Sequence, residues 1–285
     1  MDESSILIIG ANGQLGKALQ EKYPQAIAVD STQLDITDVQ AVANYDWAPI
    51  KYILNAAGYT NVDGAETPEG RVAAWKVNAS GTRNLVEIAG KHDITLVHVS
   101  TDYVFDGTQE VHKEDEPLSP LGVYGQSKAA GDIAISLAPK HYLLRASWVI
   151  GDGKNFVRSI LGLGLKQISP NVVADQFGRL TFTAELVRVI DHLLTTMPSY
   201  GTYNASNDGD IVSWADIARQ IYSDAGYSNL TVGDTTAEEY FAGKLSSPRP
   251  THSGLDVSKL KATGYTPRDW RDDLKDYIAK ELQKS

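Results

Sequence analysis

The sequence predicts an α/β fold in which a doubly wound parallel sheet is followed by a smaller C-terminal lobe. Short apolar, β-branched runs alternate with helical patterns up to about residue 150 of the 285 residues, and this alternation is typical of parallel sheets with helices on both faces. A glycine-rich turn joins the first strand pattern to the first helix pattern, and beyond Gly151 the alternation is less regular. We therefore expect one domain over residues 1–150. A second lobe covers residues 151–285, from which the chain returns to the sheet at least once.

The first element is a strand over residues 5–9, because Ser-Ile-Leu-Ile-Ile is a short apolar run of the kind buried in parallel sheets. The turn Gly10-Ala-Asn-Gly-Gln-Leu-Gly16 follows, and residues 17–22 have good helical sequence. Glycine permits a tight turn and a close approach of the backbone to a pyrophosphate. The helix N-terminus offers free N–H groups to phosphates. This context predicts a Rossmann-type dinucleotide site.

The second and third strands are expected over residues 26–30 and 51–58. The second ends in Asp30, twenty positions after Gly10, where a carboxylate accepts hydrogen bonds from the adenosine ribose and favours NAD over NADP. Asp30 could equally cap a loop. Asp35 has two similar interpretations, as a contact near the adenine or as a helix N-cap. The third strand ends in small residues beside which the cofactor could lie, namely Ala56, Ala57 and Gly58.

The next elements continue the alternation. We expect a long helix over residues 71–91, a strand over 95–105, a helix over 124–137 and a strand over 141–145. Residues 107–121 are polar and contain proline, so they are expected to form a loop that covers the site. In the C-terminal lobe, which we expect to bind the substrate, four helices are predicted over residues 155–166, 183–195, 214–225 and 272–283.

Tyr124 and Lys128 are spaced so that a helix brings them onto one face. A phenol has a pKa near 10 and is a poor proton donor at neutral pH, but a nearby ammonium favours the phenolate, so we expect the pKa of Tyr124 to be lowered. Such a tyrosine can protonate a carbonyl that is being reduced, or act as base in the reverse reaction. Thr101, at the carboxyl end of the strand over residues 95–105, can hydrogen-bond the same carbonyl. The structural alternatives are a solvated pair on an exposed helix and a hydroxyl bound to local backbone.

Arg249 lies between Pro248 and Pro250, which hold it on a stiff segment. A guanidinium in such a place can bind a diphosphate bidentately. The alternative is an ordinary surface arginine in a proline-rich turn. Trp148 has two interpretations as well, a contact with a nucleotide sugar or packing in the core.

The composition sets limits on the function. The formal charge of −10 argues against general nucleic-acid binding, and the sequence has no apolar stretch of membrane-spanning length. Six scattered histidines show no metal-ligand spacing, so no metal is expected. The absence of cysteine excludes disulfides and fits a cytoplasmic enzyme. The N-terminus does not have the order of a signal peptide.

The chain resembles the extended short-chain dehydrogenase/reductases, and more narrowly the dTDP-4-dehydrorhamnose reductases. The spacing of the glycine turn, G-x-x-G-x-x-G, points to that superfamily. The motifs that carry the resemblance run in family order along almost the whole chain: Gly10-Ala-Asn-Gly-Gln-Leu-Gly16, Leu34-Asp-Ile-Thr-Asp38, Asn55-Ala-Ala-Gly-Tyr-Thr-Asn-Val-Asp63, Ser100-Thr-Asp-Tyr-Val-Phe-Asp-Gly107, Tyr124-Gly-Gln-Ser-Lys128, Arg145-Ala-Ser-Trp-Val149 and Asp175-Gln-Phe-Gly178.

The resemblance implies NAD(P)H-dependent reduction of the C4 ketone of a 4-keto-6-deoxy sugar on a nucleoside diphosphate, dTDP-4-dehydro-L-rhamnose. It implies that Thr101, Tyr124 and Lys128 are catalytic and that Asp102 and Trp148 contact the nucleotide sugar. Both NADPH and NADH remain candidates, because Asp30 would repel a 2′-phosphate while the family commonly accepts NADPH. The residues expected at the cofactor are Gly10, Asn12, Gly13, Gln14, Leu15, Gly16, Asp30, Asp35, Ile36, Ala56, Ala57, Gly58, Tyr124 and Lys128.

Two departures from the family pattern, Leu180-Thr181 and His252-Ser253, lie in the expected substrate lobe and bear on the identity of the sugar. The alternatives are another nucleotide-sugar 4-ketoreductase, an epimerase or a dehydratase, although a dehydratase would have Glu where this chain has Tyr103. A non-catalytic dinucleotide-binding subunit, like the regulatory partner of methionine adenosyltransferase, is a further alternative. Some family members pair through magnesium-binding glutamates, but Ala18 stands at one such position. We therefore expect a monomer or a weak homodimer.

Overall fold

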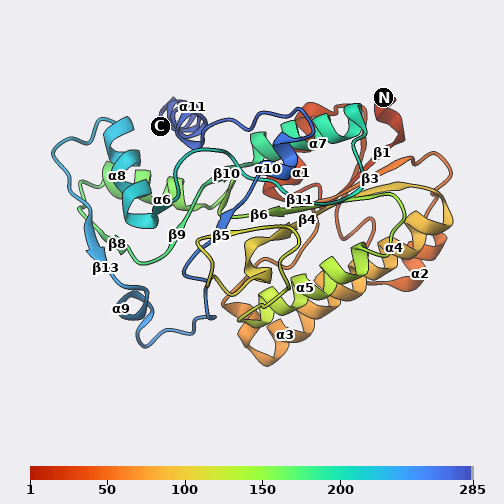
Figure 1. The fold of residues 1–285 in the computed structure, drawn as a ribbon, viewed down its shortest axis with the longest axis horizontal. Helices are drawn as coiled ribbons and strands as arrows, with labels where there is room; N and C mark the ends of the chain where they lie inside the picture. The colour runs from red at the N-terminus through yellow and green to blue at the C-terminus, as the bar shows by residue number, and fades with distance from the viewer. Residues whose placement is uncertain (284–285) are drawn as a thin grey trace.

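The computed structural model describes residues 1–283 and is built around a six-stranded parallel sheet (Figure 1). The order of its strands is β11-β6-β4-β3-β1-β2, and every neighbouring pair is parallel. The predicted α/β class with a doubly wound parallel sheet is therefore confirmed. The strands are β1 (Ile6–Ile9), β2 (Ile27–Val29), β3 (Tyr52–Asn55), β4 (Thr95–Thr101), β6 (His141–Ala146) and β11 (Gly201–Asn204).

Both faces of the sheet are covered, which explains why β1 reads as an unbroken apolar run. Ile6 and Ile8 pack into one core with α1 (Gln14–Lys22) and α7 (Thr183–Thr196). Leu7 and Ile9 point to the opposite face and pack with α2 (Val39–Asn44) and α4 (Thr82–Lys91). Figure 1 shows these two groups of helices on opposite sides of the sheet. The alternation follows from the two-residue period of a strand.

The expectation of one regular helix over residues 71–91 is wrong in its middle. The segment consists of α3 (Pro68–Trp75), a π-helical turn η3 (Lys76–Gly81) and α4. The wider turn holds the buried side chain of Asn78, which accepts a hydrogen bond from Tyr59 N at 2.8 Å and donates one to Ser127 Oγ at 2.9 Å. These bonds tie the helix to the chain after β3 and to α5 (Val123–Ile135).

Helix α5 lies close to the carboxyl end of β4 because residue 125 is glycine. A Cβ atom there would lie 2.2 Å from the carbonyl oxygen of Tyr103, inside the short turn η4 (Asp102–Val104). The start of α5 is fixed by Glu66, whose Oε1 accepts the Val123 N–H at 2.9 Å. The end of β4 and the first turns of α5 are thereby held against each other.

In the C-terminal half of the chain, an apolar core is shared by three helices, α6 (Phe156–Leu165), α8 (Trp214–Asp224) and α11 (Trp270–Leu282). The helices predicted for this half agree with the observed ones within about two residues at each end. Although β11 comes from this half of the sequence, it pairs with β6 in the main sheet. The remaining short elements are η1 (Glu3–Ser5), η2 (Gly64–Glu66), β5 (Val111–His112), β7 (Val149–Ile150), β8 (Asn171–Val173), β9 (Phe177–Gly178), β10 (Thr181–Phe182), β12 (Val212–Ser213), β13 (Gly233–Thr235), β14 (Gly254–Leu255), α9 (Ala237–Phe241) and α10 (Ser258–Lys261).

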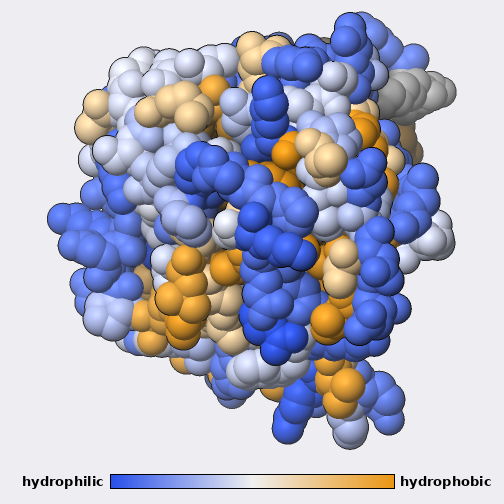
Figure 2. All heavy atoms as spheres, turned by 90° about the vertical axis from the view of Figure 1, so that its right-hand side faces the viewer, coloured by the Kyte–Doolittle hydropathy of each residue, from blue (hydrophilic) through white to orange (hydrophobic). Residues whose placement is uncertain are grey.

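Residues 107–121 have little regular structure beyond β5, which pairs with β14 from the C-terminal part of the chain. Within residues 1–283, no helix has both the length and the apolar character needed to cross a bilayer. The face shown in Figure 2 is largely hydrophilic, with hydrophobic patches between the polar side chains.

Candidate active site

The glycine turn lies where the strand order of the sheet reverses, since β1 pairs with β2 on one side and β3 on the other. Open parallel sheets bind ligands outside the carboxyl ends of their strands at such a point. Gly10 has φ +85°, and a Cβ atom on it would lie 2.6 Å from Ala57 N. Only glycine fits here, and the turn leaves the N-terminus of α1 open to a ligand.

A hollow of about 410 Å³ opens at this position. Nine of the residues expected at the cofactor line it: Gly10, Asn12, Gly13, Asp30, Asp35, Ile36, Ala56, Ala57 and Gly58. Ser31, Leu34, Thr37, Tyr59 and Val77 also line it and were not anticipated. Three of these lie within two residues of Asp30 or Asp35 in the sequence, so the loop after β2 as a whole was the available signal.

Three residues expected at the cofactor lie elsewhere around the turn. Leu15 packs into the core between the sheet and α7. Gly16 contacts the turn from behind, where a Cβ atom would lie 2.1 Å from the carbonyl oxygen of Gly10. Gln14 lines a different hollow on the other side of α1. Leu15 and Gly16 therefore support the turn from within the protein rather than from the hollow.

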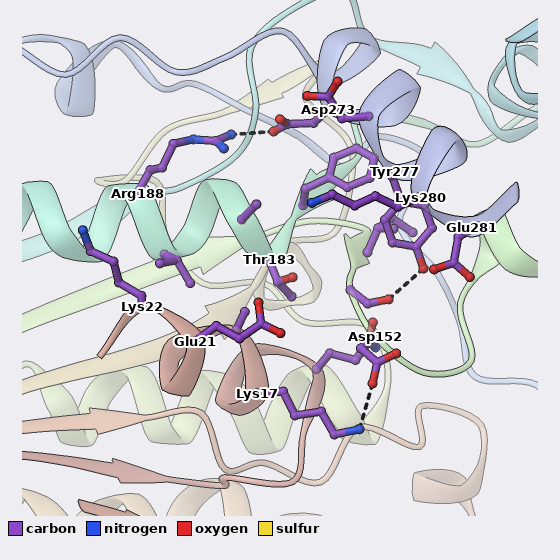
Figure 3. Close-up of a pocket in the computed structure, with 18 of the residues that line it drawn as sticks. Lys17, Glu21, Lys22, Asp152, Thr183, Arg188, Asp273, Tyr277, Lys280 and Glu281 are labelled. Atoms are coloured by element: carbon purple, nitrogen blue, oxygen red, sulfur yellow. Dashed lines mark hydrogen bonds and ion pairs between the residues drawn. The ribbon is translucent and has the colours of Figure 1, made fainter. Parts of the chain in front are cut away.

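The hollow that Gln14 lines has a volume of about 560 Å³ and lies between α1, α7 and α11 (Figure 3). Its walls are rich in charge, but much of this charge is neutralised locally. Lys17 pairs with Asp152 at 2.8 Å, and Arg188 pairs with Asp273 at 2.5 Å. Thr101, Tyr124 and Lys128 do not line this hollow.

The two carboxylates that line the hollow at Gly10, those of Asp30 and Asp35, are fixed by local hydrogen bonds. Asp30 accepts bonds from the Thr32 hydroxyl at 2.6 Å and from Asn12 Nδ2 at 2.6 Å, and these bonds lower the pKa of Asp30. Asp35 accepts bonds from Thr37, which lower the pKa of its carboxyl as well. The alternative of Asp35 as a helix N-cap is wrong, because Asp38 caps α2.

The expected catalytic residues lie one strand away from the hollow at Gly10. Thr101 is at the end of β4, and Tyr124 and Lys128 are on the first turns of α5. All three are buried, with relative exposures of 6%, 8% and 4%. The Thr101 hydroxyl donates to Asp102 Oδ1 at 3.0 Å and accepts the Tyr103 N–H at 3.2 Å. An exposed, solvated Tyr/Lys pair is therefore excluded.

The expectation that Lys128 lowers the pKa of Tyr124 is wrong for this structure. Burial raises the pKa of Tyr124, while a hydrogen bond with Thr101 acts in the opposite direction. Burial also lowers the pKa of Lys128 to about 8, against the pull of the Asp132 carboxylate. In both residues the surroundings of low polarity penalise the charged form, and this is the largest cause of each shift. Tyr124 therefore carries its proton at neutral pH.

Asp102 is the buried carboxyl group next to Thr101. Burial raises the pKa of Asp102 to about 6, while hydrogen bonds from Ser253 and Thr101 act to lower it. Its Oδ2 atom has no hydrogen-bond partner among the described residues. The sequence analysis named Ser253 only as the second residue of the pair His252-Ser253, in which His252 is the change, and in the structure the Ser253 hydroxyl lies at Asp102.

The two remaining residues expected at the substrate have partners within the protein. Trp148 has φ +47° and stacks on Trp214 with ring centroids 3.7 Å apart, so it is partly core. Arg249 is bound by both carboxylate oxygens of Asp63, at 2.8 and 2.9 Å, and its guanidinium lies over the Phe241 ring. Its side chain is 15% exposed, so it is not an ordinary surface arginine.

The sequence analysis did not identify Asn55 and His98, which lie on neighbouring strands next to Lys128. Asn55 Nδ2 and His98 Nδ1 are 2.8 Å apart, and His98 Nε2 is 3.4 Å from Lys128 Nζ. Both are polar residues inside apolar strands, and this is the signal that could have revealed them. Within the described part of the chain, no group of three or more acidic, histidine or cysteine side chains could hold a metal ion.

Comparison with known proteins identifies close similarities over the whole chain. The model of the family described as RmlD substrate binding domain matches residues 4–283. A dTDP-4-dehydrorhamnose reductase from Aggregatibacter actinomycetemcomitans is 36% identical over 295 aligned residues, covering 96% of this chain and 98% of that protein.

Two solved structures have the same fold. The dTDP-4-dehydrorhamnose reductase of Clostridium acetobutylicum has a TM-score of 0.89 and 36% identity, with 98% of this chain and 99% of that chain covered. The Bacillus anthracis enzyme of the same name, solved in complex with NADP, has a TM-score of 0.86 and 34% identity, with 97% and 98% covered.

Proposed function

The chain belongs to the RmlD substrate binding domain family, and we propose that it reduces the C4 ketone of dTDP-4-dehydro-L-rhamnose to dTDP-L-rhamnose with NADPH or NADH. The observation that carries the proposal is the buried set of Thr101, Tyr124 and Lys128 one strand away from the hollow at the switch point. The relatives named as reductases of this sugar, and the NADP complex of one of them, support the substrate and the cofactor.

The residues around the hollow fit a dinucleotide. The turn at Gly10 has no side chain to obstruct a pyrophosphate, and the N-terminus of α1 offers N–H groups to it. Asp30 and Asp35 stand where the adenosine ribose and the adenine would lie, with their carboxylates already oriented by Thr32 and Thr37. Ala56, Ala57 and Gly58 leave room along the end of β3.

The bound cofactor supplies a hydride to C4 of the sugar. Negative charge then develops on the carbonyl oxygen, to which Tyr124 donates its proton. Thr101 has one hydroxyl hydrogen, which it donates to Asp102 in the free protein, and it turns this hydrogen toward the carbonyl oxygen when the substrate is bound. A phenol kept protonated by burial is in the correct state for this step. Lys128, one turn along α5, hydrogen-bonds the nicotinamide ribose and stabilises the tyrosine once its proton has left.

The substrate is proposed to extend from this set toward the C-terminal lobe. Asp102 and Trp148 contact the nucleotide sugar, and Arg249 binds its diphosphate. Arg249 already pairs with Asp63. It therefore binds a phosphate either with the guanidinium N–H groups that Asp63 does not use, or by releasing the Asp63 carboxylate and binding the phosphate in its place. We propose that the protein acts in the cytoplasm as a monomer or weak homodimer; the lack of cysteine fits a reducing compartment.

The activity is tested by mass spectrometry of the products formed from NADPH and a panel of nucleotide 4-keto sugars, with Tyr124→Phe as the matched inactive control. Reduction of dTDP-4-dehydro-L-rhamnose in preference to the other sugars supports the proposal. Preference for a different member of the panel would make this protein another nucleotide-sugar 4-ketoreductase. Cofactor binding without turnover of any sugar would favour the non-catalytic dinucleotide-binding subunit.

A further inference from the structure

The hydrogen bonds of Asn55 determine which nitrogen of His98 carries hydrogen. Ala57 N–H, which can only donate, points to Asn55 Oδ1 at 3.1 Å. The other end of the amide, Nδ2, therefore faces His98 Nδ1 at 2.8 Å and donates to it. A neutral imidazole that accepts at Nδ1 has its hydrogen on Nε2. His98 is 1% exposed, and burial holds its pKa well below the usual value, so the neutral form applies.

The Nε2–H of His98 faces the amine of Lys128. The two nitrogens are 3.4 Å apart, and Lys128 Nζ also donates to the carbonyl oxygen of Val99 at 2.8 Å. An ammonium has three donors and no acceptor, so it cannot bind an N–H group. A neutral amine has a lone pair and can accept the hydrogen of His98 while still donating to Val99. This contact is therefore favourable with only one of the two protonation states of Lys128.

We propose that His98 is a positioning residue for Lys128. Asn55 fixes the tautomer of His98, so that the Nε2–H of His98 binds the neutral Lys128 amine and favours this form in the cofactor-free protein. The geometry requires three polar groups on adjacent elements, β3, β4 and α5, in register. A histidine that only filled space in β4 would need neither the fixed amide of Asn55 nor the approach to Lys128.

The other ionisable groups around Lys128 that bear on its protonation are Asp132, Arg145 and Tyr124. Asp132, one turn further along α5, favours the ammonium form. Its own charge is shared with Arg145 of β6, whose Nε lies 2.9 Å from Asp132 Oδ2. Tyr124, one turn before Lys128, is neutral at physiological pH. The burial of the amine and the contact with His98 oppose Asp132, so the protonation of Lys128 is balanced rather than fixed.

The tautomer can be read directly by long-range ¹H–¹⁵N correlation NMR on the labelled, cofactor-free protein. The His98 signals are assigned as those lost in His98→Gln. The proposal expects hydrogen on Nε2 in the unsubstituted protein and on Nδ1 in Asn55→Asp, because a carboxylate accepts from Nδ1–H and can still accept the Ala57 N–H. Hydrogen on Nδ1 in the unsubstituted protein would overturn the proposal.

The effect on Lys128 is measured by titrating ¹³C-lysine-labelled protein, with its signal assigned from Lys128→Arg. His98→Phe keeps the ring shape, adds no charge and removes the N–H, so we expect the ratio of ammonium to amine at a given pH to rise about tenfold. Asn55→Asp should raise it as well, and its added negative charge contributes to that rise. If His98→Phe does not fold, His98→Leu, which also adds no charge and removes the N–H, provides the measurement. His192→Phe, on α7 and distant from Lys128, is the matched control and should leave the ratio unchanged.

A ratio that is unchanged or lower in His98→Phe would mean that His98 only fills space, since a phenyl ring makes the site less polar and disfavours the ammonium. The catalytic meaning of the contact rests on the reductase activity proposed above. The titration needs neither substrate nor cofactor, so its failure is distinguishable from failure of that activity. In a working reductase, His98→Gln should shift the pH dependence of kcat while keeping the KM for the sugar, which loss of packing alone would not do.

Discussion

Replacing Tyr124 with phenylalanine removes one hydroxyl from the centre of the proposed mechanism. Loss of a general acid typically lowers turnover by about two to four orders of magnitude, or about 2.7–5.4 kcal/mol of transition-state stabilisation. The remaining groups stay satisfied, because Thr101 keeps its bonds to Asp102 and to Tyr103 N–H. The ring keeps its edge contact with Tyr103, with centroids 5.6 Å apart. We therefore expect a loss of stability of only about 1 kcal/mol.

The assay follows NADPH consumption with saturating nucleotide sugar, while NADPH affinity is measured separately by fluorescence titration. Tyr142→Phe is the matched control, because Tyr142 is also buried but donates its hydroxyl to the Pro198 carbonyl at 2.8 Å, away from the site. We expect kcat to fall in Tyr124→Phe alone, with the Kd for NADPH close to that of the unsubstituted protein. A kcat within about threefold of the unsubstituted value would remove Tyr124 as the proton donor.

Substitutions at three further residues test the cofactor end of the site, its substrate end and the raised pKa of Asp102. Asp30→Ala should weaken NADH about two- to tenfold more than NADPH; equal losses in the two Kd values would make Asp30 a loop cap only. Arg249→Ala should raise the KM for the nucleotide sugar roughly ten- to a hundredfold and leave the NADPH affinity unchanged. Arg249→Lys should recover part of this loss. An unchanged KM in both variants would remove Arg249 from the diphosphate site. Asp102 has a pKa raised to about 6, so the folded state binds its proton more tightly than the unfolded chain, and this linkage lowers the unfolding free energy as the pH rises from about 4 to 6. Asp102→Asn should consequently gain up to about 3 kcal/mol at pH 7.5 relative to pH 4 in denaturant unfolding, and an equal change at both pH values would contradict the raised pKa.

Local sequence determined the elements and the chemistry that each one carries. The apolar run of β1 and the glycines after it predicted a strand, a turn and a helix, because Gly10 needs a positive φ that only glycine adopts easily and because continuous apolar runs are typical of buried parallel strands. The four-residue spacing of Tyr124 and Lys128 on α5 is set by the period of the helix alone. The motifs around these residues also pointed to the family.

Tertiary structure decided the properties that depend on groups distant in the chain. The pKa of Tyr124 is raised rather than lowered because β4, η4 and α5 exclude water from it, and burial cannot be read from a four-residue spacing. Arg249 meets Asp63, 186 residues away, and His98 meets Asn55 and Lys128 only because β3, β4 and α5 are adjacent. Sequence thus fixed which groups are present, while packing set their protonation and partners, because electrostatic energies depend on the surroundings in three dimensions.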